Sequence, residues 1–371
     1  MKVQRYAVIM AGGRGTRFWP LSRSQRPKQL LKVLSRKSLI RETVDRITPI
    51  FNLENILVVT VSDHFKAVRQ ELHMLPKSNF LLEPKGNNTA PCIGLAAIEL
   101  TARDPNAIMT VLPADHSISD PGLFRRTLRA ASHLSEAHDA LVTIGIHPGY
   151  PETGYGYILK GKAINGPPGI SAYRVKAFKE KPTLKEAVVC LKSGALWNSG
   201  IFVWRVSTIL EMLERFTPRI FRGLQRIKQG LNGKSLGNLN PKVRVILQRE
   251  YRRMPNISID HAVLEKAGST GQVATVEAKF TWSDIGSWAS LYKLLPHDSE
   301  GNAAIGNWLG IYSRDCLVHS ANRLVVLLGM KDAMVIDTPD ALLVGDLKRA
   351  QDLREVIKQL DLKGYRRYLI K

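Results

Sequence analysis

The sequence predicts an α/β protein with a Rossmann-like, doubly wound and mostly parallel sheet, followed by a small β-rich domain at the C-terminus. Two observations lead to this fold class. In residues 1–146, apolar runs of strand length alternate with helical patterns, which is typical of parallel βαβ units. Beyond Gly301 the chain changes to short extended segments separated by turn residues, which indicates a separate β-rich unit.

The expected strands of the first unit are nearly continuous in Val, Ile, Leu and Met, as in strands that are buried on both faces. Longer helical patterns separate them. Because open α/β sheets bind ligands beyond the carboxyl ends of their strands, the loops that follow these strands are expected to carry the functional site. The strands are predicted over 6–10, 55–61, 80–82, 107–112 and 140–146, and the helices over 38–48, 90–102 and 124–137.

The remainder of the chain is predicted to contain further extended pieces, a basic helical stretch at 207–230 and a final helix at 347–360. A cluster of Pro, Asp, Ser, Gly and Asn at 296–302 marks the domain boundary, so the domains are expected to span 1–298 and 299–371. The extended pieces are predicted over 154–161, 173–178, 197–206, 310–312, 316–319, 324–328, 333–336 and 341–344.

The composition is that of an ordinary globular chain, with 44% hydrophobic and 23% charged residues. The longest apolar runs are far shorter than the roughly 20 residues of a membrane span, and the first is too short for a signal sequence. The cysteines at 92, 190 and 316 lie far apart, without a disulfide or zinc pattern. We expect a cytoplasmic protein without a membrane partner.

Positive charge is in large excess, because 54 Lys and Arg residues against 32 Asp and Glu residues give a net charge of +22. Most of the excess lies in residues 1–46 and 205–254. It favours polyanionic partners, which could be nucleic acids, an anionic membrane surface or phosphorylated small molecules. The basic segment 205–254 has few interleaved aromatic residues and no recognised nucleic-acid-binding module, so no nucleic-acid partner is expected.

A glycine-rich turn, residues 11–17, follows the first expected strand. Without side chains, its backbone amides can approach a phosphate closely. It matches neither a Walker A loop, which needs a Lys, nor a dinucleotide fingerprint, which would need glycine at Phe18. An ordinary turn is the alternative, but nearby cations, stiffened by Pro20 and Pro27, favour a triphosphate site. These cations are Arg14, Arg17, Arg23, Arg26 and Lys28.

Several blocks of sequence, in order, resemble the sugar-1-phosphate nucleotidylyltransferases. More narrowly, the chain is similar to the guanylyltransferase branch that uses GTP and mannose 1-phosphate. Each block alone carries little weight, and the series identifies the family. One departure is Asn87, where the family often has Arg. The blocks are residues 12–23, 27–30, 83–91, 113–116, 178–182, 197–202 and 282–288.

The resemblance implies that Asp115 and Asp284 bind Mg²⁺, which would bridge nucleotide and sugar-phosphate oxygens. Each aspartate also has a purely structural interpretation. Asp115 before His116 is a common turn or helix cap, and Asp284 could form a salt bridge or cap a helix over 287–295. His116 is expected to be structural.

The resemblance also assigns the other site residues. Lys181 would neutralise the sugar phosphate, although a surface lysine in a turn is the alternative. Guanine presents an N1–H and an amino group on one edge, which suits a carboxylate such as Glu83 or a backbone carbonyl nearby. Asn198 either orients the hexose or satisfies a loop backbone. The implied catalytic residues are Arg17, Lys28 and Lys181; the nucleotide-binding candidates are Ala11, Gly12, Gly13, Gly15, Thr16, Glu83 and Asn88; and the sugar-binding candidates are Gly154, Glu180 and Asn198.

The implied reaction converts GTP and mannose 1-phosphate into GDP-mannose and diphosphate. The sugar phosphate is a dianion near neutral pH and can attack the α-phosphorus in line, without a general base. Two alternatives stay open: the same chemistry with another substrate pair, and a non-catalytic regulatory homologue that binds GDP-mannose. The resemblance further implies a left-handed β-helix-like C-terminal region and a homodimer. No isomerase activity is expected, since no His-rich cupin pattern follows Gly301.

Overall fold

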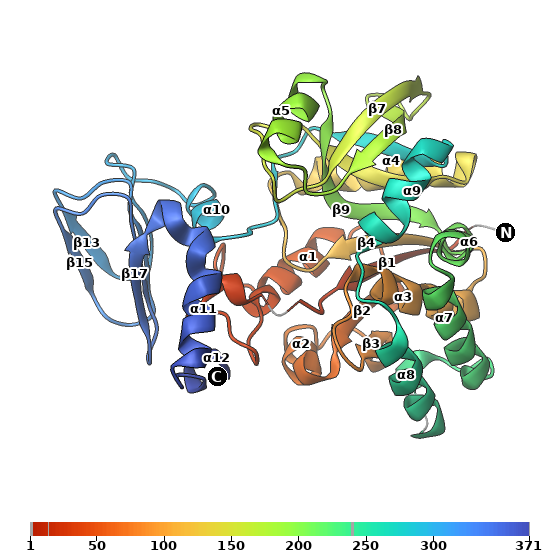
Figure 1. The fold of residues 1–371 in the computed structure, drawn as a ribbon, viewed down its shortest axis with the longest axis horizontal. Helices are drawn as coiled ribbons and strands as arrows, with labels where there is room; N and C mark the ends of the chain where they lie inside the picture. The colour runs from red at the N-terminus through yellow and green to blue at the C-terminus, as the bar shows by residue number, and fades with distance from the viewer. Residues whose placement is uncertain (1–2, 14, 239–240, 371) are drawn as a thin grey trace.

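The computed structural model describes residues 3–13, 15–238 and 241–370, which form a large α/β unit and a C-terminal β unit (Figure 1). The large unit is built on a nine-stranded sheet. Its strands are β1 (Arg5–Met10), β2 (Ile56–Val61), β3 (Phe80–Glu83), β4 (Ile108–Pro113), β6 (Leu141–Ile146), β7 (Tyr157–Ile164), β8 (Ala172–Lys179), β9 (Leu196–Arg205) and β10 (Val273–Ala278).

The strand order in this sheet is β3-β2-β1-β4-β9-β6-β10-β8-β7. Seven of these nine strands run in one direction, and β8 and β9 run antiparallel to their neighbours. The mostly parallel sheet predicted from the sequence is therefore confirmed. The loops after β1, β3 and β4 leave the sheet at the same edge because these strands are parallel, and β9 begins there because it is antiparallel.

Both faces of the sheet are buried, as the continuous apolar strands predict. Along β1, Tyr6 and Val8 point into one core, whereas Ala7 and Ile9 point into the other. The sheet is thus doubly wound. The first core is covered by α3 (Thr89–Arg103), α6 (Val206–Phe216), α7 (Pro218–Leu231) and α8 (Pro241–Arg253), and the second by α1 (Leu39–Ile47), α2 (Phe65–Glu71), α4 (Pro121–His138) and α5 (Leu184–Lys192).

The basic stretch at 207–230 is not one helix. It divides into α6 and α7 at Thr217, whose backbone leaves the helical region with φ −140° and ψ 59°. Pro218 explains the break, because its ring restricts the preceding residue and its nitrogen cannot donate a hydrogen bond. Among the described helices, none is long and apolar enough to cross a membrane.

The C-terminal unit is a β-helix-like coil. Its strands are β12 (Ala303–Ile305), β13 (Trp308–Ile311), β14 (Leu317–Ser320), β15 (Val325–Leu328), β16 (Ala333–Asp337) and β17 (Leu342–Asp346). From β12 to β16, successive strands alternate between two sheets: β12, β14 and β16 are parallel in one, and β13 and β15 are parallel in the other. β17 then pairs antiparallel with β16. The chain therefore winds through stacked turns, which confirms the β-helix-like prediction. The left-handed sense stays a prediction.

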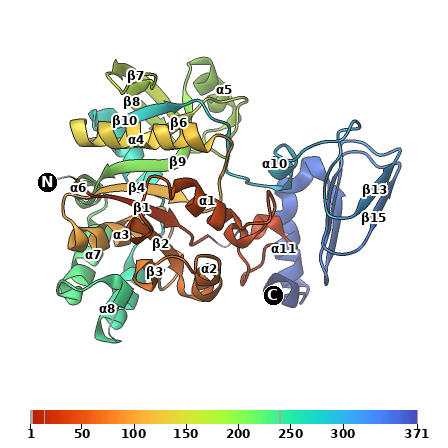
Figure 2. The ribbon, with the colours of Figure 1, turned by 180° about the vertical axis from the view of Figure 1, so that it is seen from behind.

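The expected final helix is a 3₁₀ turn, Leu347–Asp352, followed by α11 (Leu353–Leu362) and the short α12 (Arg367–Ile370). Figures 1 and 2 both place α11 between β17 and the N-terminal segment that follows β1. Phe18 and Leu31 of that segment share one buried cluster with Leu317, Ile336 and Leu353. The C-terminal unit is thus packed directly against the segment that contains the expected catalytic residues.

Candidate active site

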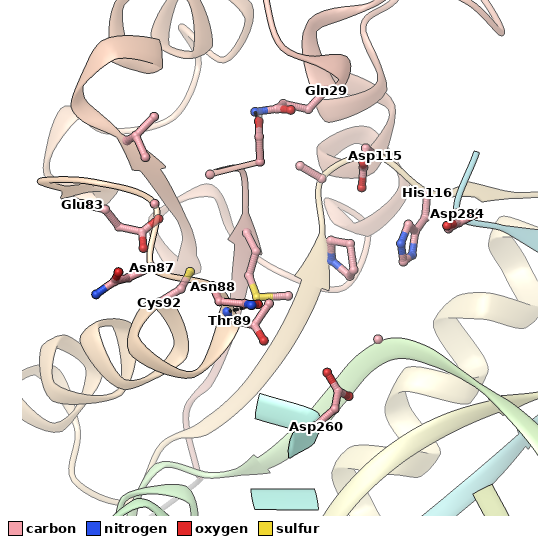
Figure 3. Close-up of a pocket in the computed structure, with 18 of the residues that line it drawn as sticks. Gln29, Glu83, Asn87, Asn88, Thr89, Cys92, Asp115, His116, Asp260 and Asp284 are labelled. Atoms are coloured by element: carbon pink, nitrogen blue, oxygen red, sulfur yellow. Dashed lines mark hydrogen bonds between the residues drawn. The ribbon is translucent and has the colours of Figure 1, made fainter. Parts of the chain in front are cut away.

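Two adjoining cavities, of about 1020 Å³ and 290 Å³, open where the loops after β1, β3 and β4 meet. Figure 3 shows residues that line the larger one. Both are lined by Asp115, His116 and Asp284. Ala11 lines neither cavity and is buried, with its carbonyl accepting hydrogen bonds from Gln29 and Thr60. The other predicted residues are Gly12, Gly13, Glu83, Asn88, Gly154, Glu180, Lys181 and Asn198 in the larger cavity, and Gly15, Thr16, Arg17 and Lys28 in the smaller.

Two positions of the glycine-rich turn need glycine for steric reasons. Gly15 has φ +58°, and a Cβ there would lie 2.5 Å from Cβ of Lys28. At Gly12 an added Cβ would lie 2.7 Å from Oε2 of Glu83. The turn therefore lies close to Lys28, a candidate catalytic residue, and to Glu83, the candidate for binding the base. Arg14, the first cation of the predicted cluster, lies outside the described residues.

Lys28 connects the two aspartates at the junction of the cavities. Its Nζ lies 2.8 Å from Oδ2 of Asp115 and also donates a hydrogen bond to the backbone oxygen of Asp284. Burial raises the pKa of Asp115, but the adjacent Lys28 outweighs it and holds that pKa below its usual range. Oδ1 of Asp284 accepts a hydrogen bond from the Tyr155 hydroxyl at 2.8 Å. Asp115 is therefore a carboxylate at neutral pH.

Asp284 does not cap the helix that follows it. The helix expected over 287–295 is α10 (Trp288–Tyr292), and its N-cap is Ser287, whose hydroxyl accepts from the amide of Ser290 at 3.2 Å. The side chain of Asp284 is directed to the cavities instead. Figure 3 shows Asp115, His116 and Asp284 gathered at one end of the larger cavity.

Two carboxylates, Asp115 and Asp284, are available to a metal ion at this junction. In the described part of the chain, no group of three or more His, Cys, Asp and Glu side chains is arranged to hold one. Mg²⁺ suits a site of this kind, since it usually takes one or two carboxylates and completes its octahedral shell with phosphate oxygens and water. The present position of the Lys28 ammonium shows that a cation is stabilised here.

His116 is fixed by its neighbours and is not available as a base. Trp282 donates its indole N–H to Nδ1 of His116 at 3.1 Å. Burial lowers the pKa of His116 to about 4, so the imidazole is neutral at pH 7. The histidine supports the cavity wall, as expected from the sequence.

The expected hexose end of the cavity contains a pair of oppositely charged neighbours. Lys181 Nζ lies 3.2 Å from Oε1 of Glu180, and the lysine side chain is 62% exposed. A Cβ on Gly156 would lie 2.5 Å from Oε2 of Glu180. Glycine at this position therefore allows the Glu180 carboxylate to lie against the backbone.

Asn198 forms a hydrogen bond with Asp260, a residue that the sequence did not single out. Its Nδ2 donates to Oδ1 of Asp260 at 2.8 Å, while its Oδ1 accepts from the Thr143 hydroxyl at 2.9 Å and the amide of Gly200 at 3.2 Å. Burial raises the pKa of Asp260 to about 7, and the negative charge of Glu180 adds to the rise. Asp260 begins a short π-helix, Asp260–Leu264, a conformation frequent at functional sites but not readable from periodicity.

The expected base end of the cavity is tied to α8. Glu83, at the end of β3, is only 2% exposed and accepts a hydrogen bond from the Tyr251 hydroxyl. Asn87 donates to the backbone oxygens of Tyr251 at 2.9 Å and Met254 at 3.1 Å. Asn88 caps α3, because its Oδ1 accepts from the next backbone amide at 2.9 Å. Asn87, where the family often has Arg, therefore anchors a helix.

Comparison with known proteins is consistent with this arrangement. Residues 6–301 match the nucleotidyl transferase family, and residues 306–360 match the mannoseP isomerase/GMP-like beta-helix domain. An Escherichia coli K12 protein named mannose-1-phosphate guanylyltransferase is 36% identical over 366 residues, covering 97% of this chain and 74% of the relative. The Xanthomonas campestris xanthan biosynthesis protein XanB is 37% identical over 360 residues, covering 96% of this chain and 73% of XanB.

Among solved structures, one described as mannose-1-phosphate geranyltransferase from Thermus thermophilus superposes with a TM-score of 0.85 at 31% identity. The match covers 97% of this chain and 100% of the Thermus chain. A Helicobacter pylori structure described as mannose-6-phosphate isomerase has a TM-score of 0.60 at 27% identity, over 76% of this chain and 100% of its own. On the match over 6–301 and these near full-length similarities, the chain belongs to the nucleotidyl transferase family.

Proposed function

We propose that this chain is a mannose-1-phosphate guanylyltransferase, which converts GTP and α-D-mannose 1-phosphate into GDP-mannose and diphosphate. The names of the relatives that align over nearly the whole chain support the substrate pair. The observation that carries the chemistry is the cluster of Lys28, Asp115 and Asp284 at the junction of the two cavities. This cluster lies between the glycine-rich turn and the Glu180–Asn198 end, where two phosphorylated substrates would meet.

The two substrates would bind at opposite sides of this cluster. The backbone of Gly12, Gly13, Gly15 and Thr16 would cradle the triphosphate, with the guanine base near Glu83. The hexose would lie against Gly154 and Glu180, next to Asn198. Asn88 would line this surface while it caps α3, and the buried Ala11 would support the turn from beneath.

In the proposed reaction, a phosphate oxygen of mannose 1-phosphate attacks the α-phosphorus of GTP. A new P–O bond forms as the bond from the α-phosphorus to the bridging β-phosphate oxygen breaks, and diphosphate leaves with the electron pair. No general base is needed, because the nucleophile is already ionised near neutral pH. Arg17 and Lys28 would stabilise the charge on the triphosphate, and Lys181 would neutralise the sugar phosphate.

We further propose Mg²⁺ as the cofactor, held by Asp115 and Asp284. When bound, the ion would neutralise charge on the phosphate oxygens and help to orient them. The ionised state of Asp115 fits a hard cation that prefers oxygen ligands, and Nδ1 of the neighbouring His116 is already occupied by the indole N–H of Trp282.

The test is diphosphate release from the purified protein with Mg²⁺, crossing GTP, ATP, UTP and dTTP with mannose, glucose and fructose 1-phosphates. Turnover is expected with GTP and mannose 1-phosphate. Asp115→Asn and Asp284→Asn should each lower kcat by on the order of 100-fold, the loss typical of one group that stabilises developing charge. Asp361→Asn, on the exposed end of α11, serves as the matched control and should keep full activity.

Turnover with a different pair would retain the chemistry and overturn the substrate assignment. Absence of turnover with every pair, together with measurable binding of GDP-mannose, would instead establish a regulatory, non-catalytic protein. Wild-type activity in both aspartate variants would remove them from the metal site.

We also propose that the protein forms a homodimer through the outer face of β13 and β15. Leu309, Ile311, Val326 and Leu328 are all exposed on this two-stranded sheet, and contiguous exposed apolar side chains of this kind mark protein interfaces. Light scattering should give twice the chain mass of 41.4 kDa. Val326→Lys should shift the protein to the monomer, and a monomeric wild type would overturn the proposal.

A further inference from the structure

Tyr251 is a buried polar residue that the proposed reaction does not use. It lies near the end of α8, has no exposed surface and donates its hydroxyl hydrogen bond to Oε1 of Glu83. The two residues are 168 positions apart in the sequence. Tyr251 lines neither cavity, but its hydroxyl is directed to Glu83, the cavity-lining carboxylate expected to contact the base, and this suggests a role in base recognition.

Each carboxylate oxygen of Glu83 has a close neighbour. Oε1 is bound by Tyr251, and Oε2 lies against Gly12, so closely that a Cβ there would be 2.7 Å away. Tyr251 is itself held, because Asn87 donates to its backbone oxygen at 2.9 Å. Figure 3 shows Glu83 and Asn87 side by side at the end of the cavity remote from Asp115 and Asp284.

The protonation state of such a carboxyl group selects the base that it can pair with. An ionised carboxylate only accepts hydrogen bonds, so it suits the N1–H and 2-amino group of guanine. A protonated carboxyl group donates one bond and accepts another, which suits N1 and the 6-amino group of adenine. A group that keeps Glu83 ionised and oriented would therefore favour GTP over ATP.

The charges around Glu83 make the contribution of Tyr251 decisive. Burial raises the pKa of Glu83 to about 7, and the hydrogen bond from Tyr251 opposes the rise. The other titratable neighbour is Cys92, and burial raises the pKa of both Tyr251 and Cys92, so both are neutral at pH 7. Within the described residues, no Lys or Arg forms an ion pair with Glu83. Loss of the Tyr251 hydroxyl would thus protonate Glu83 over a wider pH range.

We infer that Tyr251 is the positioning residue for base selection, and that its hydroxyl holds Glu83 as an acceptor aimed at the guanine edge. This inference rests on the proposed function, because it takes Glu83 as the group that contacts the base. Tyr251 acts through Glu83 and touches no substrate itself.

The test is Tyr251→Phe, which keeps the buried ring and removes the hydroxyl. We would measure kcat and KM for GTP, ITP and ATP with saturating mannose 1-phosphate between pH 6 and 9. At pH 7 the KM for GTP should rise about tenfold, the effect of one lost hydrogen bond, with kcat and the KM for mannose 1-phosphate little changed. The KM should recover as the pH rises, because Glu83 ionises. ITP, which lacks the 2-amino group, should be affected less, and the preference for GTP over ATP should narrow.

Two further variants separate this role from a structural one. Glu83→Gln, which cannot ionise, should lose the preference for GTP at every pH. Tyr312→Phe, at a tyrosine that is 91% exposed on the C-terminal unit, should behave as wild type. Thermal melting of each variant checks that it is folded.

The outcomes distinguish the inference from the proposed function. An inactive wild type would refute the function itself. An active wild type, with a Tyr251→Phe variant that keeps the same base preference and pH profile, would overturn the inference alone. Equal losses with GTP, ITP and ATP at every pH would also overturn it, since they would indicate a purely structural tyrosine.

Discussion

At the residue scale, Asp260 shows how the proposed sugar end of the site is built from partners that are distant in the sequence. Asn198 was expected either to bind the hexose or to satisfy a loop backbone. In the structure, its side-chain oxygen accepts hydrogen bonds from Thr143 and Gly200, and its side-chain nitrogen donates one to Asp260. Asp260 and Glu180 then face the same cavity, and two neighbouring carboxyl groups are well suited to accept hydrogen bonds from sugar hydroxyls.

Asp260→Asn is therefore expected to weaken binding of the sugar substrate selectively. At pH 8, where Asp260 with its pKa of about 7 is mostly ionised, the amide keeps the shape of the side chain but is a weaker acceptor than the carboxylate. The KM for mannose 1-phosphate should then rise about tenfold or more, as for a lost hydrogen bond to a charged group. The KM for GTP should stay near the wild-type value. Steady-state kinetics with each substrate varied in turn would measure both, with the exposed Asp361→Asn as the control. Equal changes in the two KM values would contradict the assignment.

At the element scale, local patterns predicted most of the strands and helices, because their cores follow strong periodicities and buried apolar runs. β1, β2 and β4 begin within a residue of the predicted positions. The same patterns also placed most candidate residues on loops at one edge of the sheet. They could not reveal Tyr251 or Asp260, since each owes its position to a tertiary contact with a distant segment. The backbone break at Thr217 was missed for a different reason: Pro218 signals it in the sequence, but the basic helical periodicity continues on both sides.

Asn87→Ala tests how α8 is tied to the loop after β3. Asn87 is buried, and its amide satisfies two backbone oxygens at the end of that helix. Loss of these two hydrogen bonds should lower the free energy of unfolding by about 1–3 kcal/mol, because the two buried acceptors are left without donors. The KM for GTP should also rise because Tyr251 is displaced. Urea unfolding would measure the first effect, with the exposed Asn106→Ala as control, and unchanged stability would show that water or neighbouring groups replace the amide.

At the scale of the whole molecule, the two units are joined more closely than a simple linker would allow. We propose the division at residues 298 and 299, at a turn where Asp298 accepts from the amides of Glu300 and Asn302. Across this division, backbone amides of Ser24 and Gln25 donate to the oxygens of residues 369 and 370 at 3.0 and 3.1 Å. The C-terminal end thus holds the segment that leads from the glycine-rich turn to Lys28.

One ion pair across the division makes this coupling measurable. Arg23, which is 6% exposed, donates to both carboxylate oxygens of the half-exposed Asp340 at 2.6 Å. This hydrogen bonding holds the pKa of Asp340 below its usual range in the folded protein. A carboxyl group with a lowered pKa stabilises the fold at pH values above its unfolded pKa of about 3.9, and that contribution is lost as the pH falls through the folded pKa.

Asp340→Asn should therefore lower the free energy of unfolding by about 1–2 kcal/mol at pH 7, a moderate loss because solvent screens the exposed side of the pair. The difference from wild type should persist down to about pH 5 and vanish at lower pH, as wild-type Asp340 also becomes neutral. Thermal unfolding from pH 3 to 7 would measure this profile. Asp352→Asn breaks a matched but exposed pair with Arg349 and should change stability by less than about 0.5 kcal/mol.

Asp340→Asn should also lower kcat if the C-terminal unit positions the segment that leads to Lys28, because Arg23, the partner of Asp340, lies only five residues before Lys28. Loss of stability with unchanged kcat would mean that the C-terminal unit supports the fold alone. A fall in kcat that follows the stability profile with pH would instead tie the position of Lys28, and with it the junction of the two cavities, to the contact between the two units.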